Sequence, residues 1–598
     1  MRLAGQGRIL VGLLSVHALL LGYGAAIHAP GWDEVGHLPA GISHWQLGNT
    51  DLYRVNPPLV RMLATLPLMG IEWDLPWAWS SAPLARPEFG LGRELWTRHG
   101  AAAYWYLTYA RWAVIPLSLL AGLVIFRWSR DLYGGAAGLL AVSLWCFSPM
   151  VLTNAQLITP DVGSAALGAL AGYAFWKWLH DRSADIAWMA GILLGLAQLT
   201  KFTWIILYLL WPTLWALHFL RDRRSYREAW RWPEAGQLVC ILALSLLVIN
   251  IGFAFEGTMT RLGDYRFVSA TLTGTSSQDR PRGERTGNRF SESWPGRLPV
   301  PLPSNYVLGI DRQKYDFDSS HYMSYLRGEW RDRGWWYYYL YGLAIKEPVG
   351  FIVLALMAGR MTARRRDFWR DEGVLLAPAA LVLVLVSSQT GFNHHLRYVL
   401  PAFPFAFIWM GKLWGRADDS ESPVRDRWRR RAAAVMLACG IAPSLYVYPH
   451  SHAYFNSLVG GPMRGHEHLL DSNLDWGQDL LLLADWAERH PQMKLDGVAY
   501  SLSHLLPRAD VGLPDEHPPR GYQPGDYSQR AGGVADRDAF GPRPGLWAVF
   551  VRPLHDQYPN FHYFQFFEPI EVLGYTVYIY QLDEEDVRRY WEAQEDAG

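Results

Sequence analysis

Three carboxylates lie beside long apolar segments of this chain, where charged side chains are costly and often serve a function. Asp33 and Glu34 directly follow the first apolar segment. Asp161 follows Thr159 and Pro160 between two later apolar segments. A carboxylate in such a place can take the proton of an attacking hydroxyl group. We therefore predict that Asp33, Glu34 and Asp161 are catalytic.

Cations and polar side chains accompany these carboxylates at the ends of the same segments. Arginine holds a phosphate through a bidentate fork and lysine acts as a point charge, so both stabilise a departing phosphate. The predicted phosphate-binding residues are Arg61, Lys201, Lys346 and Arg397. The predicted substrate-binding residues are His37, Asn56 and Tyr398. Together the acids and cations fit glycosyl transfer from a phosphate carrier.

Each candidate also has a purely structural interpretation. Asp161 after Thr-Pro suits a helix cap, and Asp33 suits the cap of a surface helix. Lys201 can extend to lipid headgroups, and Lys346 can pair with Glu347. For His394-His395 a polar loop is favoured over a metal site, because adjacent helical side chains do not face one point.

The elements that must position these residues are membrane helices. Uncharged runs such as 238–254 and 432–447 recur along the chain, which is not the pattern of a soluble core. The first run, after Arg2 and Arg8, is longer than a signal-peptide core and is interpreted as a retained helix. The predicted spans are 9–28, 106–126, 134–152, 162–179, 186–200, 203–220, 237–256, 337–358, 374–390, 398–415 and 431–448.

Basic residues fix the predicted orientation. If each span crosses once, all the arginine clusters fall on one side, which the positive-inside rule makes the cytoplasm. Lys201 divides 186–220 into two short spans or one kinked span, and the charge pattern favours two. The clusters are Arg2 and Arg8; Arg127 and Arg130; Arg182; Arg221, Arg223, Arg224, Arg227 and Arg231; Arg360, Arg364, Arg365, Arg366 and Arg370; and Arg416, Arg425, Arg427, Arg429, Arg430 and Arg431.

The predicted fold is therefore mainly α and polytopic, with about eleven transmembrane helices in residues 1–448. Outer loops cover 29–105 and 257–336, with amphipathic surface helices near 34–48 and 58–69 and a mobile loop at 270–300. Residues 449–598 are expected to form a small extracytoplasmic α/β domain. Its predicted elements are a helix at 477–490, strands at 497–501, 546–551 and 572–581, and a helix at 584–594.

Composition excludes several classes of function. Lys+Arg and Asp+Glu both number 55, so net charge indicates no nucleic-acid partner. The three cysteines, Cys146, Cys240 and Cys439, lie inside predicted spans and show no CxxC or zinc spacing. No nucleotide-binding glycine motif and no internal repeat are present.

The motifs resemble those of protein-O-mannosyltransferase-like glycosyltransferases, family 39 enzymes of the GT-C fold that include the lipid A aminoarabinose transferases. The matching residues are Asp33-Glu34 with His37, Gly41 and Gly48; Pro57-Pro58-Leu59; Thr159-Pro160-Asp161; Gly195-Leu196-Ala197 with Thr200-Lys201; Gly334 to Tyr338; and Arg397-Tyr398 with Pro401. The segments 454–456, 460–462 and 471–480 are similar to a bacterial branch of the family.

This resemblance implies a polyprenyl-phosphate-linked sugar donor and an inverting transfer on the outer face of the cell (inner or plasma) membrane. It implies Asp33 as base, Asp161 as a second important acid and Arg61 as the holder of the carrier phosphate. In this chain Arg61 stands where the family has lysine, and Asn56 stands where it has histidine. Arginine can still hold the carrier phosphate, but the geometry of the contact differs. Some relatives bind a divalent metal, but the sequence shows no compelling ligand set. A lipid, glycan or protein acceptor stays open, although the β-trefoil insertion of eukaryotic protein mannosyltransferases is missing.

Two other classes of function compete with this one. A transporter or flippase of lipid-linked saccharides would show inverted repeats and ionisable residues near the bilayer midplane. Here the candidate ionisable residues gather at one surface. A non-catalytic sensor or assembly protein would work through residues 449–598. We expect the glycosyltransferase, because the site placement and the resemblance agree.

Overall fold

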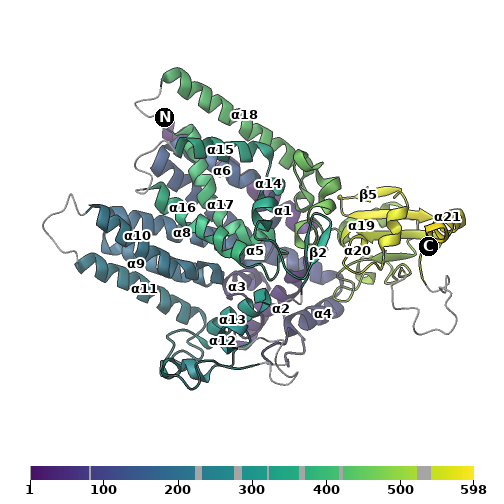
Figure 1. Cartoon of the computed structure of the whole chain (residues 1–598), viewed down its shortest axis with the longest axis horizontal. Coiled ribbons are helices and arrows are strands. Elements are labelled where there is room, and N and C mark those ends of the chain that lie inside the picture. The colour runs from purple at the N-terminus through teal and green to yellow at the C-terminus, as the bar shows by residue number, and fades with distance from the viewer. Residues whose placement is uncertain are drawn as a thin grey trace.

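The computed structural model describes residues 2–79, 82–222, 232–274, 286–318, 322–362, 371–415, 422–521 and 540–597. The chain is mainly helical, and its C-terminal strands gather at one end of a helical body (Figure 1). The arginines at 223–231, 364–370 and 416 and part of the predicted loop 270–300 lie outside the described residues.

Helices of the first half pack as neighbours along the chain. Contacts join α1 to α5 and α6, α5 to α8, and α9 to both α8 and α11. Their bounds are α1 (Arg2–Ile27), α2 (Trp32–Leu47), α3 (Leu59–Thr65), α4 (Pro87–His99), α5 (Ala101–Tyr133), α6 (Gly135–Phe147), α7 (Pro149–Asn154), α8 (Pro160–Asp181), α9 (Ala184–Gln198), the 3-10 helix η2 (Phe202–Ile206), α10 (Leu207–Asp222) and α11 (Trp232–Gly252).

Helices of the second half of the chain pack on one another and on helices of the first half. Helix α17 packs on α5 and α6, and α18 packs on α15. The bounds are α12 (Ala270–Thr273), α13 (Ser304–Asp318), α14 (Tyr338–Lys346), α15 (Val349–Thr362), α16 (Glu372–Ser388), the 3-10 helix η6 (Leu396–Ala402), α17 (Phe403–Met410), the 3-10 helix η7 (Gly411–Trp414) and α18 (Pro423–Val447). The hairpin β1 (Ser324–Leu326) and β2 (Glu329–Arg331) precedes α14.

Few helices have the length and composition of a complete membrane span. In the described part of the chain, α1, α5 and α11 qualify. Helices α14 and α15 qualify only together, as a broken span or a re-entrant loop with a bend of 117°. Pro348 explains the bend, because proline cannot continue a helical hydrogen-bond ladder. The predicted span 398–415 becomes η6, α17 and η7, and 134–152 divides into α6 and α7 before Pro149. The count of eleven spans stays a prediction.

The first outer loop folds into helices near the expected positions, but not as one-sided surface helices. Helix α2 is buried at every residue from Glu34 to His44, whereas a helix lying on a membrane surface would expose one face. Gly48 ends it in the left-handed conformation that glycine adopts without strain (φ 66°).

The C-terminal residues form one small mixed sheet in the order β3-β4-β6-β5. The β3–β4 pair is parallel and the other two pairs are antiparallel. The elements are α19 (Leu480–Arg489), β3 (Gly497–Ala499), β4 (Gly545–Phe550), α20 (Val551–Leu554), β5 (Glu571–Leu573), β6 (Val577–Leu582) and α21 (Glu584–Ala597).

Two long helices connect opposite ends of the molecule. Helix α1 has 26 residues and α18 has 25, so each extends about 38 Å at 1.5 Å per residue. Both begin beside arginines at the end away from the C-terminal sheet, and both end near that sheet (Figure 1). Asp33 follows the end of α1, so it lies at the opposite end of that helix from Arg2 and Arg8.

Candidate functional site

A cavity of about 590 Å³ lies where the ends of distant segments meet. Six of the predicted site residues line it: Asp33, Asn56, Asp161, Lys201, Arg397 and Tyr398. They come from the start of α2, the turn before α3, the start of α8, the α9–η2 turn and the start of η6. The cavity therefore joins five parts of the chain that are distant in sequence.

Four charged side chains form a continuous chain across the cavity. Lys201 Nζ donates to Asp161 Oδ1 at 2.6 Å. Arg397 Nη2 donates to Asp33 Oδ2 at 2.5 Å, and Arg397 Nε lies 3.6 Å from Asp161 Oδ2. Arg397 thus connects the two carboxylates, and each cation neutralises an acid.

Local structure places both carboxylates in the first turn of a helix. Asp33 follows Trp32 in α2, and Asp161 follows Pro160 in α8. Helix N-termini favour negative charge through the helix dipole. Lys201 is buried in its pair with Asp161 and does not extend to headgroups.

Arg397 keeps hydrogen-bonding capacity that the protein does not use. Among the described residues, its buried Nε and Nη1 have no hydrogen-bond partner. Its guanidinium stacks on Trp476 at 4.2 Å, and Gly31 leaves room for that ring, because a Cβ there would lie 2.5 Å from Trp476. Buried donors without acceptors are costly. They suit an anionic ligand that enters the cavity.

Two further ion pairs line the cavity beyond this centre. Arg86 Nη1 lies 3.4 Å from Asp316, and Arg552 Nη2 lies 3.4 Å from Asp471. Burial raises the pKa of Asp471, but Arg552 and His394 outweigh burial and hold that pKa well below its usual value. Asp471 therefore stays ionised beside the cavity.

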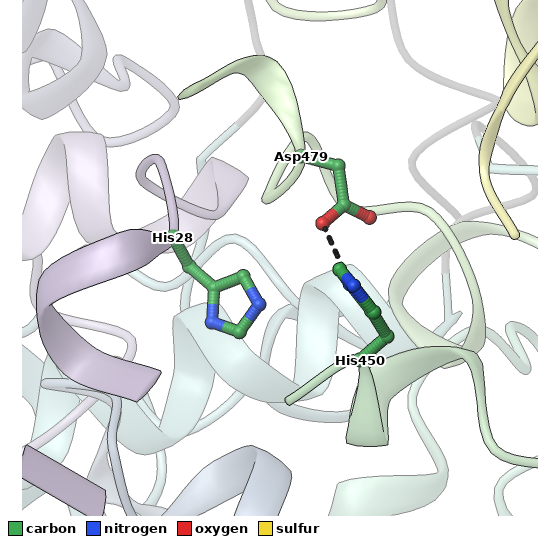
Figure 2. Close-up of side chains that lie close together, drawn as sticks. All are labelled: His28, His450 and Asp479. Atoms are coloured by element: carbon green, nitrogen blue, oxygen red, sulfur yellow. Dashed lines mark ion pairs between the residues drawn. The ribbon is translucent and has the colours of Figure 1, made fainter. Parts of the chain in front are cut away.

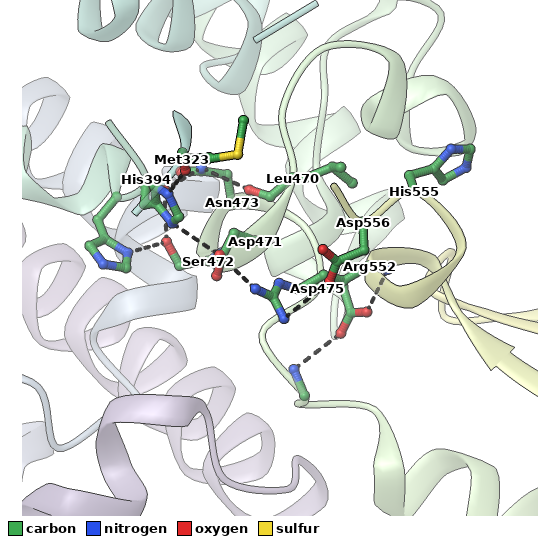
Figure 3. A network of polar contacts seen from close by, with 12 residues as sticks. Met323, His394, Leu470, Asp471, Ser472, Asn473, Asp475, Arg552, His555 and Asp556 are labelled. Carbon is green, nitrogen blue, oxygen red and sulfur yellow. Dashed lines mark hydrogen bonds and ion pairs between the residues drawn. The ribbon is translucent and has the colours of Figure 1, made fainter. Parts of the chain in front are cut away.

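Asp471 and Trp476 of the segment 471–479 line the cavity, and Figure 3 shows the polar contacts of this segment with His394 and Arg552. His394 Nδ1 donates to Asp471 at 3.0 Å, and Asn473 Nδ2 donates to the His394 carbonyl at 2.6 Å. Asn473 Oδ1 accepts the N–H of Leu396 at 2.9 Å. This segment consequently fixes the start of η6 and with it the position of Arg397.

Asp475 makes the same segment sensitive to pH. It accepts the backbone N–H groups of Arg552 and Gly477, yet burial raises its pKa to about 7. Because the pKa of Asp475 is higher in the folded than in the unfolded protein, this side chain favours the folded state at a pH below its unfolded pKa. That stabilisation is lost as the pH rises through about 7.

We expect the melting temperature of wild-type protein to fall more between about pH 4 and about pH 8 than that of Asp475→Asn. Asp485→Asn, at an exposed pair, serves as control, and equal pH profiles for wild type and Asp475→Asn would contradict the assignment.

Glu34 does not lie among the described residues that line the cavity. Its carboxylate is fully buried and accepts Arg111 Nε at 3.0 Å, the Gly31 N–H at 3.0 Å and the Ile158 N–H at 3.1 Å. Arg111 also donates to three carbonyls at the end of α1. In the structure Glu34 therefore links α1, α2 and α5, and its catalytic role stays a prediction.

Glu34→Ala is expected to destabilise the protein by about 3–5 kcal/mol, because it leaves Arg111 as an unpaired buried charge. The melting temperature of the purified protein and its folded yield measure the effect. The control Glu94→Ala breaks an exposed pair with Arg98 and should change stability by less than about 1 kcal/mol. Wild-type stability of Glu34→Ala would show that Glu34 is not structural.

Three other predicted residues also lie away from the described lining of the cavity. Arg61 is buried and donates to His44 at 2.7 Å, with its guanidinium 5.8 Å from the Tyr53 ring. His37 packs on Tyr53, and burial lowers the pKa of His37 to about 3. Lys346 donates to two backbone carbonyls, those of His452 at 2.7 Å and Asn473 at 2.6 Å. All three side chains are buried outside the described lining of the cavity.

Sequence reasoning did not assign several residues of the cavity: Arg86, Asp316, His394, Asp471, Trp476, His504 and Arg552. The dense polar segment 471–479 was the available signal, because so many Asp, Ser, Asn and Gln residues rarely gather without partners. No comparable pattern marks Arg86, Asp316 or Arg552.

Comparisons with known proteins were made for sequence and for structure. No curated protein sequence matches the chain. ArnT from Cupriavidus metallidurans in the apo state aligns with a TM-score of 0.43 and 15% identity over 96% of this chain and 98% of that chain. The same protein bound to undecaprenyl phosphate gives 0.44 and 13% over 96% and 98%. The archaeal oligosaccharyltransferase AglB from Archaeoglobus fulgidus, in complex with an inhibitory peptide and a dolichol-phosphate, gives 0.39 and 13% over 91% and 69%.

One part of the chain matches a family model. Residues 107–249, which include Asp161 and Lys201, match the profile described as dolichyl-phosphate-mannose-protein mannosyltransferase. The predicted resemblance to mannosyltransferase-like glycosyltransferases is thus confirmed over residues 107–249.

Proposed function

We propose that this protein transfers a sugar from a polyprenyl-phosphate carrier to an acceptor on the outer face of the membrane. The observation that carries the proposal is the environment of Arg397. It binds Asp33, faces Asp161 and lines a large cavity, and among the described residues its buried Nη1 has no hydrogen-bond partner. An acid for the acceptor hydroxyl and donors for a phosphate thus lie side by side.

The proposed reaction is a single displacement. Asp33 takes the proton of the acceptor hydroxyl as its oxygen forms a bond to the anomeric carbon. The bond from that carbon to the phosphate oxygen breaks, and its electron pair leaves with the carrier phosphate. Arg397 and Lys201 stabilise the charge on the phosphate, while Asp161 holds both cations in place. Attack from the face opposite the phosphate inverts the anomeric centre.

A second cavity suits the carrier chain. It has a volume of about 460 Å³ and is lined mainly by apolar side chains of α15, α16 and α17. Val399 of η6 lines it, while the neighbouring Arg397 and Tyr398 line the polar cavity. A lipid phosphate bound across η6 can therefore place its chain among apolar groups and its phosphate beside Arg397.

The arginines at the opposite ends of α1 and α18 support the proposed outward position of the site. The positive-inside rule assigns that end to the cytoplasm. The cavity and the C-terminal sheet then face outward, and Trp476 from residues 449–598 completes the site. We assign the carrier phosphate to Lys201 and Arg397 rather than to Arg61, because Arg61 is enclosed behind Tyr53.

Carrier release tests the proposal. Purified protein is incubated with polyprenyl-phosphate sugars labelled in the sugar, with cell-envelope extract as the acceptor source. At least one donor should yield free polyprenyl phosphate together with labelled acceptor. The proposal fails if wild-type protein binds the donors and releases no carrier from any of them.

A further inference from the structure

A second polar cluster joins three distant parts of the chain outside the described lining of the 590 Å³ cavity. His28 follows α1, His450 follows α18, and Asp479 directly precedes α19. One ligand atom from each residue lies within 4.8 Å of the others, and Figure 2 shows the three side chains converging. His450 Nδ1 and Asp479 Oδ1 are 3.5 Å apart.

The converging atoms lack hydrogen bonds. Within the described ranges, His28 Nε2, His450 Nδ1 and Asp479 Oδ1 are all buried without a hydrogen-bond partner. His28 is 6% exposed and Asp479 is 1% exposed, so bulk water does not satisfy them. Three such atoms aimed at one point are unusual, because buried polar groups almost always have partners.

The remaining polar atoms of these residues are held in orientations suited to a ligand. His28 Nδ1 donates to the Gly24 carbonyl at 2.9 Å, which leaves Nε2 with its free lone pair. Asp479 Oδ2 accepts Thr576 Oγ1 at 2.6 Å and Gln478 Nε2 at 2.9 Å, which leaves Oδ1 free. Such outer hydrogen bonds orient the ligands of metal sites.

The backbone around the cluster is also fixed. Arg111 donates to the His28 carbonyl at 2.6 Å, and the Ala29 N–H donates to the Gln478 carbonyl at 2.8 Å. Gly574 borders the cluster, and a Cβ there would lie 2.9 Å from His450 Nδ1. The absence of that Cβ keeps space open at the ligand nitrogen.

We propose that His28, His450 and Asp479 bind one divalent transition-metal ion of the Zn²⁺ class. Two imidazoles and one carboxylate are a zinc donor set, and tetrahedral bonds of about 2.1 Å place ligand atoms about 3.4 Å apart. The His450–Asp479 separation of 3.5 Å already matches this spacing. The His450 side chain is 21% exposed, which leaves a route for the ion and for a water as fourth ligand.

The metal would connect the end of the first membrane helix, the end of the last one and the C-terminal sheet. Asp479 follows Trp476 by three residues, so the ion would also restrain the segment that stacks on Arg397. The proposed site is thus a structural metal site that links the helical part of the chain to its C-terminal part. It does not depend on the proposed function, because none of its three ligands belongs to the described lining of the 590 Å³ cavity or takes part in the proposed transfer.

Zinc content measures the site directly. Full-length protein, purified in detergent with a tag free of histidine and stripped by a chelator, is incubated with Zn²⁺ and freed of unbound ion. Wild type should retain one equivalent per chain, and His28→Gln and Asp479→Asn should lose it. His490→Ala serves as control and should retain the ion, because the His490 side chain lies in the same C-terminal region and bonds to the Trp486 carbonyl of its own helix.

A second measurement separates metal binding from folding. Zn²⁺ should raise the melting temperature of wild type and of His490→Ala, and it should leave that of His28→Gln unchanged. Co²⁺ in wild type should give the visible absorption of a tetrahedral site. Retention of zinc by His28→Gln and Asp479→Asn, or failure of stripped wild type to bind Zn²⁺, would overturn the proposal, and carrier release could persist in either case.

Discussion

Asp33→Asn is expected to lower the rate of sugar transfer by about 10²- to 10⁴-fold, the usual contribution of a general base. Asparagine keeps the size of the side chain and an oxygen that can accept the N–H of Arg397, so the cavity should persist. The proton of the acceptor hydroxyl then has no acceptor at this position. Initial rates at saturating donor, with the melting temperature as a check on folding, give the result.

Asp74→Asn is the matched control, since Asp74 is almost fully exposed in a pair with Arg98. It should transfer sugar at the wild-type rate. Wild-type activity of Asp33→Asn would remove Asp33 as the base and direct attention to Asp161, the other carboxylate bound to Arg397.

Arg397→Ala is expected to lower kcat by about 10²- to 10³-fold, as loss of a donor to developing charge does. It removes the donors for the phosphate, and it also leaves Asp33 without its 2.5 Å partner. Arg397→Lys keeps the charge but loses the planar fork and the stacking on Trp476, so it should recover only part of the activity. Steady-state kcat and KM for the donor distinguish the two variants.

The control for Arg397 is Arg464→Ala, because Arg464 is exposed and pairs locally with Glu467. It should show wild-type kinetics. If Arg397→Lys matched wild type in kcat/KM, a bidentate contact between the Arg397 guanidinium and the carrier phosphate would have no part in the reaction.

The sequence located much of the site because membrane helices confine where charges can lie. Asp33, Asp161, Lys201 and Arg397 each stand at the end of an apolar run, and the predicted alternation of spans would place such ends on one face. In the structure all four line one cavity, which also requires tertiary packing that the alternation does not predict. The C-terminal helices and two of the strands also lie near their expected positions, because their apolar patterns are local. The predicted strand 572–581 is wrong, because the chain turns within it and forms β5 and β6, which pair with each other in antiparallel orientation.

Other assignments depended on information that a single sequence does not hold. Glu34 is next to Asp33 in sequence, but consecutive helical side chains point about 100° apart, so only Asp33 faces the cavity. Lys346 is the last residue of α14, and the sequence did not predict the sharp bend between α14 and α15 that follows it. Asp471 and Arg552, or His28 and His450, are brought together by tertiary packing across long stretches of chain.

The most direct test of the central claim uses a polyprenyl-phosphate sugar with different labels on the sugar and on the carrier. Protein in sealed liposomes receives this donor together with acceptor. A transferase site at Asp33 and Arg397 predicts that the two labels separate, the sugar onto the acceptor and the carrier as free phosphate, and that Asp33→Asn prevents this. Both labels crossing the bilayer on one intact molecule would contradict the account.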